Sequence, residues 1–129
     1  ALVTASFTEL VEAVMTALPQ GTFAAVVTGE EVAKGKPDPE PYLLAADRLG
    51  VEITRCVALE DSLPGVSSAQ ASDAATIAEP LIVDIPPHPR RRVLPTLTGV
   101  RPGDLAAILA ELNPAPAKEQ WSDEGHHPQ

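Results

Sequence analysis

One stretch, Cys56 to Gly65, constrains the fold of this chain more than any other. The apolar run Cys56–Leu59 predicts a buried strand, and the run ends in two adjacent carboxylates, Glu60 and Asp61. The residues that follow favour a turn into a helix: Ser62, Pro64 and Gly65. In an open α/β sheet, ligands bind where strands end at their carboxyl side. This stretch therefore predicts a parallel sheet with two acids at its ligand-binding edge.

Two carboxylates at such an edge repel each other and lose part of their hydration. A positive group beside them is therefore expected, because it compensates for both costs. A hard divalent cation such as Mg²⁺, which takes few carboxylates and keeps several waters, would satisfy them. The alternative is an ordinary strand–turn junction, with Asp61 solvated and Ser62 capping the helix. The stretch by itself does not decide between these interpretations.

Composition limits the class of protein. The 129 residues suffice for one domain, and 44% of them are hydrophobic while only 3% are aromatic, which suits the aliphatic strands of an α/β protein. A net charge of −9 argues against binding to nucleic acid. Cys56 is the only cysteine, so no internal disulfide forms, and a cytoplasmic location is expected. We find neither a signal peptide nor an apolar run long enough to enter a membrane.

A second signal lies at the start of the chain. Ala1–Thr4 has the pattern of a strand end, and Ser6 with Glu9 matches a helix capping box. The expected helix carries one apolar face: Phe7, Leu10, Val11, Val14 and Leu18. The Thr4 hydroxyl would then lie beside free backbone N–H groups at a helix N-terminus, which is an arrangement that binds anions.

A third signal follows the next expected strand, Phe23–Thr28. Lys36 lies on a constrained backbone between Gly35 and Pro37, so its ammonium is directed rather than loose. Asp38 is expected to cap a helix that ends at Gly50 and buries one face: Tyr42, Leu43, Ala46 and Leu49. The glycine spacing and Pro37 exclude a phosphate-binding P-loop.

The remainder of the chain predicts further α/β elements. We expect a helix over 64–71, a strand over 74–78, an extended apolar run over 81–85 and an amphipathic helix over 104–112. Arg90–Arg92 is interpreted as a solvated basic loop. After Asn113 the composition becomes polar and proline-rich, so we expect an α/β core domain over 1–113 and a disordered tail over 114–129.

Taken together, the three signals are similar to the motifs of the haloacid dehalogenase superfamily, in particular of its subgroup with β-phosphoglucomutase and sugar-phosphate phosphatases. The resemblance covers about Leu2 to Ala78 and rests on three runs: Val3–Ser6, Gly35–Tyr42 and Leu59–Val66. It implies a Rossmann-like parallel sheet with helices on both faces. It also implies a phosphatase or phosphomutase that acts on a small phosphorylated metabolite through an aspartyl-phosphate, with Mg²⁺ as cofactor.

The resemblance assigns roles to individual residues. Thr4 would hydrogen-bond the transferring phosphoryl group, with the Ala5 backbone N–H assisting. Lys36 would balance charge between the nucleophile and the phosphoryl oxygens. Asp61 would be a direct ligand of Mg²⁺, and Glu60 would support it. Positioning and charge neutralisation supply most of the catalysis in such reactions.

The chain also departs from the family pattern. The Asp-x-Asp motif, which supplies the nucleophile from the family's first strand, is absent from these 129 residues, as is the helical cap domain that usually follows it. That strand would lie between the strands that end at Thr4 and at Asp61. We therefore expect a catalytically incomplete core, whose exposed sheet edges associate with each other or with a missing N-terminal segment. The alternative is a non-catalytic remnant that acts as a binding or assembly module.

Overall fold

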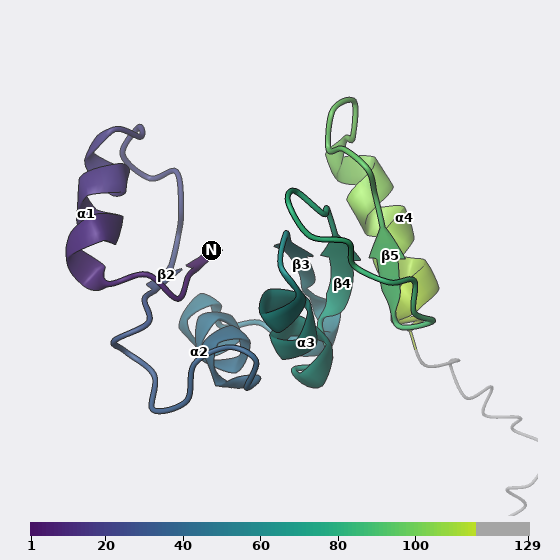
Figure 1. Ribbon diagram of the computed structural model, residues 1–129, viewed down its shortest axis with the longest axis horizontal. Coiled ribbons are helices and arrows are strands. Elements are labelled where there is room, and N and C mark those ends of the chain that lie inside the picture. The colour runs from purple at the N-terminus through teal and green to yellow at the C-terminus, as the bar shows by residue number, and fades with distance from the viewer. Residues whose placement is uncertain (116–129) are drawn as a thin grey trace, which may run out of the picture.

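The computed structural model describes residues 1–115, which form an α/β fold (Figure 1). The helices are α1 (Thr8–Thr16), α2 (Glu40–Leu49), α3 (Leu63–Ala71) and α4 (Pro102–Leu112), with one 3₁₀ turn, Ile53–Arg55. The strands are β1 (Leu2–Val3), β2 (Val26–Val27), β3 (Val57–Glu60), β4 (Ala75–Ala78) and β5 (Arg91–Val93). Nearly all of the predicted tail, residues 116–129, lies outside the described residues.

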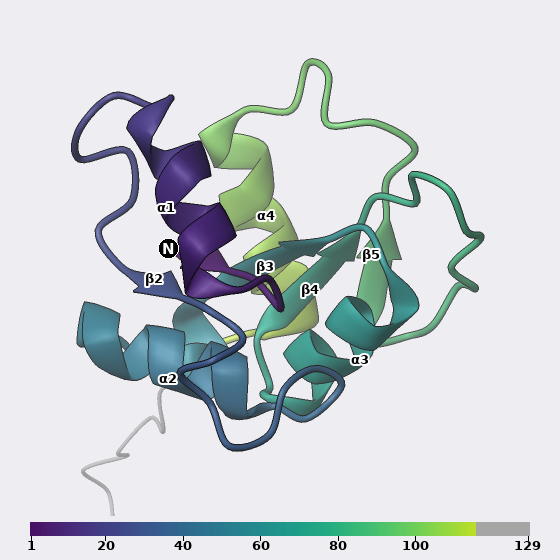
Figure 2. The ribbon, with the colours of Figure 1, turned by 60° about the vertical axis from the view of Figure 1, so that its left-hand side comes forward.

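The strands form two parallel sheets, with the order β1-β2 in one and β3-β4-β5 in the other. Helix α2 packs on β1 and β2, and α3 packs on β3 and β4. Helix α4 also packs on β4, on the side away from α3 (Figure 2). The predicted α/β class, with a parallel sheet and helices on both faces, is therefore confirmed.

The sheet is interrupted where the sequence predicts a missing strand. Within residues 1–115, no strand pairing joins β1 to β3. In Figure 1 the part of the chain that contains β2 and α1 stands apart from the sheet formed by β3 and β4. Helix α2 connects the two parts, because it contacts β1 and β2 on one side and α3 on the other.

Small aliphatic residues build the core, as the composition predicts. One cluster joins α2, α3 and β3 through Tyr42, Ala58, Ala69 and Ala74, with Val3 and Ile53 packed against it. A second cluster lies at the other end of the β3-β4-β5 sheet and contains Val66, Ala78 and Ile85. Strand β4 is buried along its whole length, which confirms the strand predicted over 74–78.

The predicted buried face of the first helix is wrong in most positions. Only Val11 is buried, and Phe7, Leu10, Val14 and Leu18 are exposed. Strands β1 and β2 have two residues each, so they present too little surface to cover the whole stripe. The capping box is also absent: α1 begins at Thr8, whose backbone N–H is bound by Glu30 Oε1 at 3.1 Å.

Three further expectations need correction. Leu43 and Leu49 of α2 are exposed, and Ala45 is buried in their place. The apolar run over 81–85 forms no strand; Ile85 is buried while Ile82 is 90% exposed. Part of the predicted basic loop instead forms edge strand β5, which pairs with β4 through its backbone and so needs no apolar side chains.

Candidate active site

Lys36 connects the carboxyl ends of the two separated sheets. Its ammonium donates to the carbonyl oxygen of Val3, at the end of β1, at 3.0 Å. It also forms an ion pair with Glu60 Oε1, at the end of β3, at 2.6 Å. The side chains of Lys36 and Glu60 are only 13% and 7% exposed. Lys36 therefore bonds to the residue before Thr4 and to the residue before Asp61, so the three sequence signals converge as predicted.

Hydrogen bonds fix the loop that directs Lys36. Asp38 Oδ1 accepts from the backbone N–H of Glu40, the first residue of α2, at 3.0 Å. The N-cap of α2 is Pro39, however, and not Asp38 as the sequence predicts. Ser68 of α3 donates to the Asp38 carbonyl at 2.6 Å. The Glu40 carboxylate in turn accepts from the backbone N–H of Lys34 at 2.7 Å. The loop before α2 is thereby fixed to both neighbouring helices.

Glu60 is held by contacts on both of its carboxylate oxygens. Oε1 accepts from Lys36 and from the Tyr42 hydroxyl. Oε2 lies against Gly65, where an added Cβ would meet it at 1.9 Å. The Lys36 ammonium also lies 5.5 Å from the centre of the Tyr42 ring, within cation–π range. Burial, and then the hydrogen bond to Glu60, raise the pKa of Tyr42 well above its ordinary value.

Asp61 differs from Glu60 because its side chain is exposed. It lies at the turn between β3 and α3, where Ser62 caps the helix by accepting from the backbone N–H of Gly65 at 3.3 Å. Asp61 and Glu79 line one shallow hollow, together with Leu59, Glu60 and Leu97. Glu79 Oε2 is buried and has no hydrogen-bond partner in the described part of the chain.

The carboxylates at this hollow are ligands of the kind that a hard cation prefers. Mg²⁺ is usually bound by one or two carboxylates and completes its shell with water. Asp61 offers an exposed carboxylate, and Glu79, which has a buried oxygen without a partner, also lines the hollow beside it. Among residues 1–115, no three His, Cys, Asp or Glu side chains are grouped so that they could hold a metal by themselves.

The loop after β1 positions Thr4 and Ala5. Thr4 Oγ1 accepts from the backbone N–H of Ser6 at 3.1 Å, which leaves the hydroxyl hydrogen available to donate. Gly29 packs so closely on this loop that an added Cβ would meet the Ala5 carbonyl oxygen at 2.2 Å. The Gly29 N–H also donates to the Ser6 carbonyl at 3.0 Å. The half-buried Thr4 and exposed Ala5 therefore lie in a fixed turn.

Sequence reasoning missed three residues of this site. Tyr42 was predicted only as a core residue, and periodicity gives no sign that its hydroxyl binds Glu60. Gly65 was predicted only as a turn residue, although it leaves the space for the Glu60 carboxylate. Glu79 comes directly after the strand predicted over 74–78. An acid at a strand end is the signal that identified Asp61, so the same signal could have identified Glu79.

Comparison with known proteins identifies the family. The model of the haloacid dehalogenase-like hydrolases matches residues 1–73, which is more than half of the chain. This protein belongs to the haloacid dehalogenase-like hydrolase family. The match includes Thr4, Lys36, Glu60 and Asp61, so all of the predicted site residues lie within it.

The relatives place this haloacid dehalogenase-like chain with the phosphatase subgroup. It is 43% identical to hexitol phosphatase A of Escherichia coli over 60 residues, which cover 46% of this chain and 28% of the relative. It resembles the crystal structure of CbbY from Rhodobacter sphaeroides in complex with phosphate, with a TM-score of 0.66 and 29% identity over 76% of this chain and 46% of that one. A putative β-phosphoglucomutase from Thermotoga maritima matches with a TM-score of 0.56 and 28% identity, over 64% of this chain and 39% of that one.

The haloacid dehalogenase-like chain spans less than half the length of each of these relatives. Activity, substrate and partners of a whole relative therefore enter only as proposals. As for membranes, none of the helices in residues 1–115 combines the length and the apolar character needed to cross a bilayer.

Proposed function

We propose that these residues form one part of a Mg²⁺-dependent phosphoryl-transfer site, and that the complete site acts on a small phosphorylated metabolite through an aspartyl-phosphate. The observation that supports this best is the buried Lys36–Glu60 pair, which joins the carboxyl ends of β1 and β3. A buried ammonium at that edge is suited to balance the negative charge of a phosphoryl group and its nucleophile. We further propose that the protein works in the cytoplasm.

Thr4 and Ala5 would hold the transferring group. The Thr4 oxygen already accepts a hydrogen bond from Ser6, so its hydrogen can donate to a phosphoryl oxygen while the hydroxyl stays oriented. The Ala5 N–H would be the second donor, on a turn that Gly29 keeps in place. Donors fixed before the substrate arrives need no reorganisation during the reaction, which is the main source of electrostatic catalysis.

Asp61 would bind Mg²⁺ directly, and Glu60 would support the site. Bound there, the ion would neutralise charge on the phosphoryl oxygens. The geometry gives the two acids different tasks, because Glu60 Oε1 is already bound by Lys36 and Tyr42 whereas Asp61 is exposed. Glu60 then acts chiefly by keeping the Lys36 ammonium at the strand ends.

The nucleophile has to come from outside these residues, because the 129-residue sequence contains no Asp-x-Asp motif. We infer that the chain by itself does not hydrolyse phosphate esters. A non-catalytic binding or assembly module is the second candidate, and the same absence favours it. The two candidates differ in whether an added Asp-x-Asp segment restores turnover.

The test is a graft. An N-terminal segment that contains an Asp-x-Asp strand is fused before Ala1, and hydrolysis of p-nitrophenyl phosphate is measured with Mg²⁺ and with EDTA. We expect Mg²⁺-dependent turnover in the graft and none in the 129-residue chain. Lys36→Met or Asp61→Asn in the graft should each reduce kcat by about a hundredfold or more.

Two results would contradict the proposal. Turnover by the ungrafted chain that disappears in Asp61→Ala would show that the site is complete without the graft. A folded graft that binds phosphate but does not turn over would favour the non-catalytic module. Leu43→Lys, an exposed change on α2, serves as the control for general effects of substitution.

A further inference from the structure

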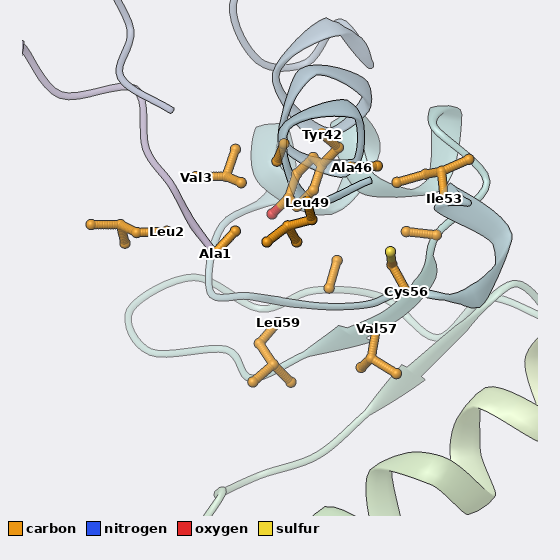
Figure 3. Close-up of a pocket in the computed structure, with 13 residues that line it drawn as sticks. Ala1, Leu2, Val3, Tyr42, Ala46, Leu49, Ile53, Cys56, Val57 and Leu59 are labelled. Atoms are coloured by element: carbon orange, nitrogen blue, oxygen red, sulfur yellow. The ribbon is translucent and has the colours of Figure 1, made fainter. Parts of the chain in front are cut away.

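The described fold has an apolar groove between its two sheets. Its volume is about 240 Å³, and residues of β1, α2 and β3 line it. Figure 3 shows Leu2 and Val3 on one side of the groove, Leu49 of α2 above, and Val57 and Leu59 of β3 below. The strand expected between β1 and β3 would fill this groove, so it belongs to the interrupted sheet already described.

A larger hollow lies at the opposite end of β3, between the 3₁₀ turn and the last residues of α4. Its volume is about 620 Å³, and its lining comes from the turn, from the end of α4 and from the residues directly after that helix. A cavity of about 150 Å³ already holds a benzene molecule. The hollow is therefore large enough for an aromatic side chain.

The Asn113 side chain holds this hollow in shape. Its Nδ2 donates to the carbonyl oxygen of Thr54 at 3.1 Å and to that of Asp73 at 2.9 Å. These two bonds join the end of α4 to the 3₁₀ turn and to the turn before β4. The two walls of the hollow are thereby fixed relative to each other.

The walls differ in chemistry. Leu112, at the end of α4, is half-buried and forms an apolar wall. Arg55, at the end of the 3₁₀ turn, is exposed, and no acid within residues 1–115 forms a salt bridge with it. A ligand that suits both walls combines an apolar surface with an affinity for a guanidinium.

The sequence directly after the hollow contains such a group. The described residues end at Ala115, which itself lines the hollow, and Trp121 follows six residues later. Six residues span at most about 20 Å when fully extended, so Trp121 can reach back over a short connection. Tryptophan offers a large apolar surface, and its ring is the aromatic face that best attracts a cation.

Charge favours the same contact. Residues 116–129 contain one lysine and three acids. Two of the acids, Glu119 and Asp123, flank Trp121 at a separation of two residues, so they would come near Arg55 when the indole does. A short connection gives an effective concentration in the millimolar range, on the order of 1 mM, at which even a weak contact forms.

We propose that Trp121 docks in this hollow, with its indole ring packed on Leu112 and stacked on the Arg55 guanidinium. Residues 116–129 lie outside the described residues, and docking would give this stretch of disorder-predicting composition one anchor. The proposal is independent of the proposed function, because the Lys36–Glu60 pair lies at the other end of β3 and docking is measured without catalysis.

Trp121 reports on its own docking, since it is the only tryptophan. Its fluorescence is excited at wavelengths that tyrosine does not absorb, for the 129-residue chain in buffer and in urea. We expect the acrylamide quenching constant to be about threefold smaller in buffer, because a packed indole is shielded from the quencher. In NMR spectra, NOEs should connect the indole protons to the methyl groups of Leu112.

Paired substitutions separate docking from general effects. Arg55→Glu and Leu112→Ser should each raise the quenching constant of Trp121 about twofold, because each removes one of the two contacts. Arg101→Glu and Leu105→Ser are the matched controls and should leave it unchanged. Arg101 is exposed at the other end of α4, Leu105 is half-buried on the same helix, and neither lines the hollow. Arg55→Glu changes an exposed side chain, so it tests the contact even if Leu112→Ser lowers stability.

Three outcomes would overturn the proposal. Equal quenching in buffer and in urea would show that the indole of Trp121 stays in solvent. Protection that neither Arg55→Glu nor Leu112→Ser reduces would place the indole on another surface. Protection that increases with the concentration of the chain would identify a second copy as the molecule to which Trp121 binds.

Discussion

Gly65 and Glu60 depend on each other at the scale of single residues. An alanine at position 65 would place its Cβ 1.9 Å from Glu60 Oε2, so the buried carboxylate would have to move away from Lys36 and Tyr42. We expect Gly65→Ala to lower the free energy of unfolding by about 1–3 kcal/mol, as overpacking in a core does.

Gly35→Ala is the matched control for this prediction, because an added Cβ at Gly35 meets no atom within 4 Å. Urea denaturation of both variants measures the difference. Equal stability of the two would show that the Glu60 carboxylate has room to move without loss.

The Tyr42 hydroxyl is the second contact that orders Glu60. Tyr42→Phe removes a donor to a buried carboxylate, and we expect a loss of about 1.5–3 kcal/mol. The pH dependence tests the same contact. Because burial and Glu60 raise the pKa of Tyr42 in the folded state, its contribution is complete below the unfolded pKa of about 10 and declines as the pH rises above that value.

The wild-type chain should therefore lose stability more steeply above pH 10 than Tyr42→Phe does. Since Tyr42 is the only tyrosine, its ionisation can be followed by absorbance in the same samples. If the free energy of unfolding falls equally steeply with pH above pH 10 in both proteins, the result would argue against the buried hydrogen bond.

At the scale of elements, the turn between α3 and β4 contains a residue with an unfavourable backbone conformation. Asp73 has φ of +73°, a region that L-residues other than Asn and Asp rarely adopt. We compare Asp73→Gly with Asp73→Ala, since both variants lose the exposed ion pair to Arg90 and differ only in the cost of that conformation. The glycine variant should be more stable than the alanine variant by about 1 kcal/mol in thermal or urea unfolding. A more stable alanine variant would show that position 73 does not require a positive φ.

A second link between elements joins the end of β2 to α2. Glu31 accepts from Arg48 at 2.9 Å and from the backbone N–H of Thr28 at 2.8 Å. The hydrogen bond from Arg48, followed by that from Thr28, lowers the pKa of Glu31 from 4.5 to about 2. A lowered folded pKa stabilises the fold above the unfolded pKa, and this contribution is lost as the pH falls from about 4.5 toward 2.

Glu31→Gln should therefore reduce the loss of stability in that pH range, measured by urea denaturation at a series of pH values. Glu9→Gln, which removes an exposed carboxylate from α1, is the control. If the stability of both variants depends on pH as that of the wild type does, Glu31 does not support the packing of α2 on β2.

The elements predicted from the sequence are those that local chemistry determines. Ser62 caps α3, Gly50 ends α2 with φ of +68°, and the small residues of 74–78 form a buried strand. The convergence of Lys36 with the end of β3 was also predictable, because parallel strands place their carboxyl ends at one edge.

Other features depend on packing partners that periodicity does not reveal. The stripe from Phe7 to Leu18 is apolar, yet residues 1–115 provide cover only for Val11. Strand β5 forms at Arg91–Val93 because its backbone pairs with β4, although its side chains gave no strand signal. The Tyr42 hydroxyl reaches Glu60 through the tertiary fold, at a sequence separation of 18 residues.

At the scale of the whole molecule, we predict that the groove between β1 and β3 makes the isolated chain prone to self-association. Edge strands with unpaired backbone groups pair with other edges, and charged side chains on an edge prevent this. Leu59 lies on the free edge of β3, lines the groove and is 47% exposed. Leu59→Lys would therefore place an ammonium at the edge with little effect on the buried core.

We expect the wild-type chain to form concentration-dependent oligomers in sedimentation velocity experiments and Leu59→Lys to remain a monomer. Ile82→Lys is the matched control, because it removes a more exposed apolar side chain, at 90% exposure, from a loop that does not line the groove. If Ile82→Lys suppresses association as well as Leu59→Lys does, general surface hydrophobicity rather than the open sheet edge drives it. A wild-type chain that stays monomeric and unfolds cooperatively at all concentrations would show that the edges of β1 and β3 do not associate on their own.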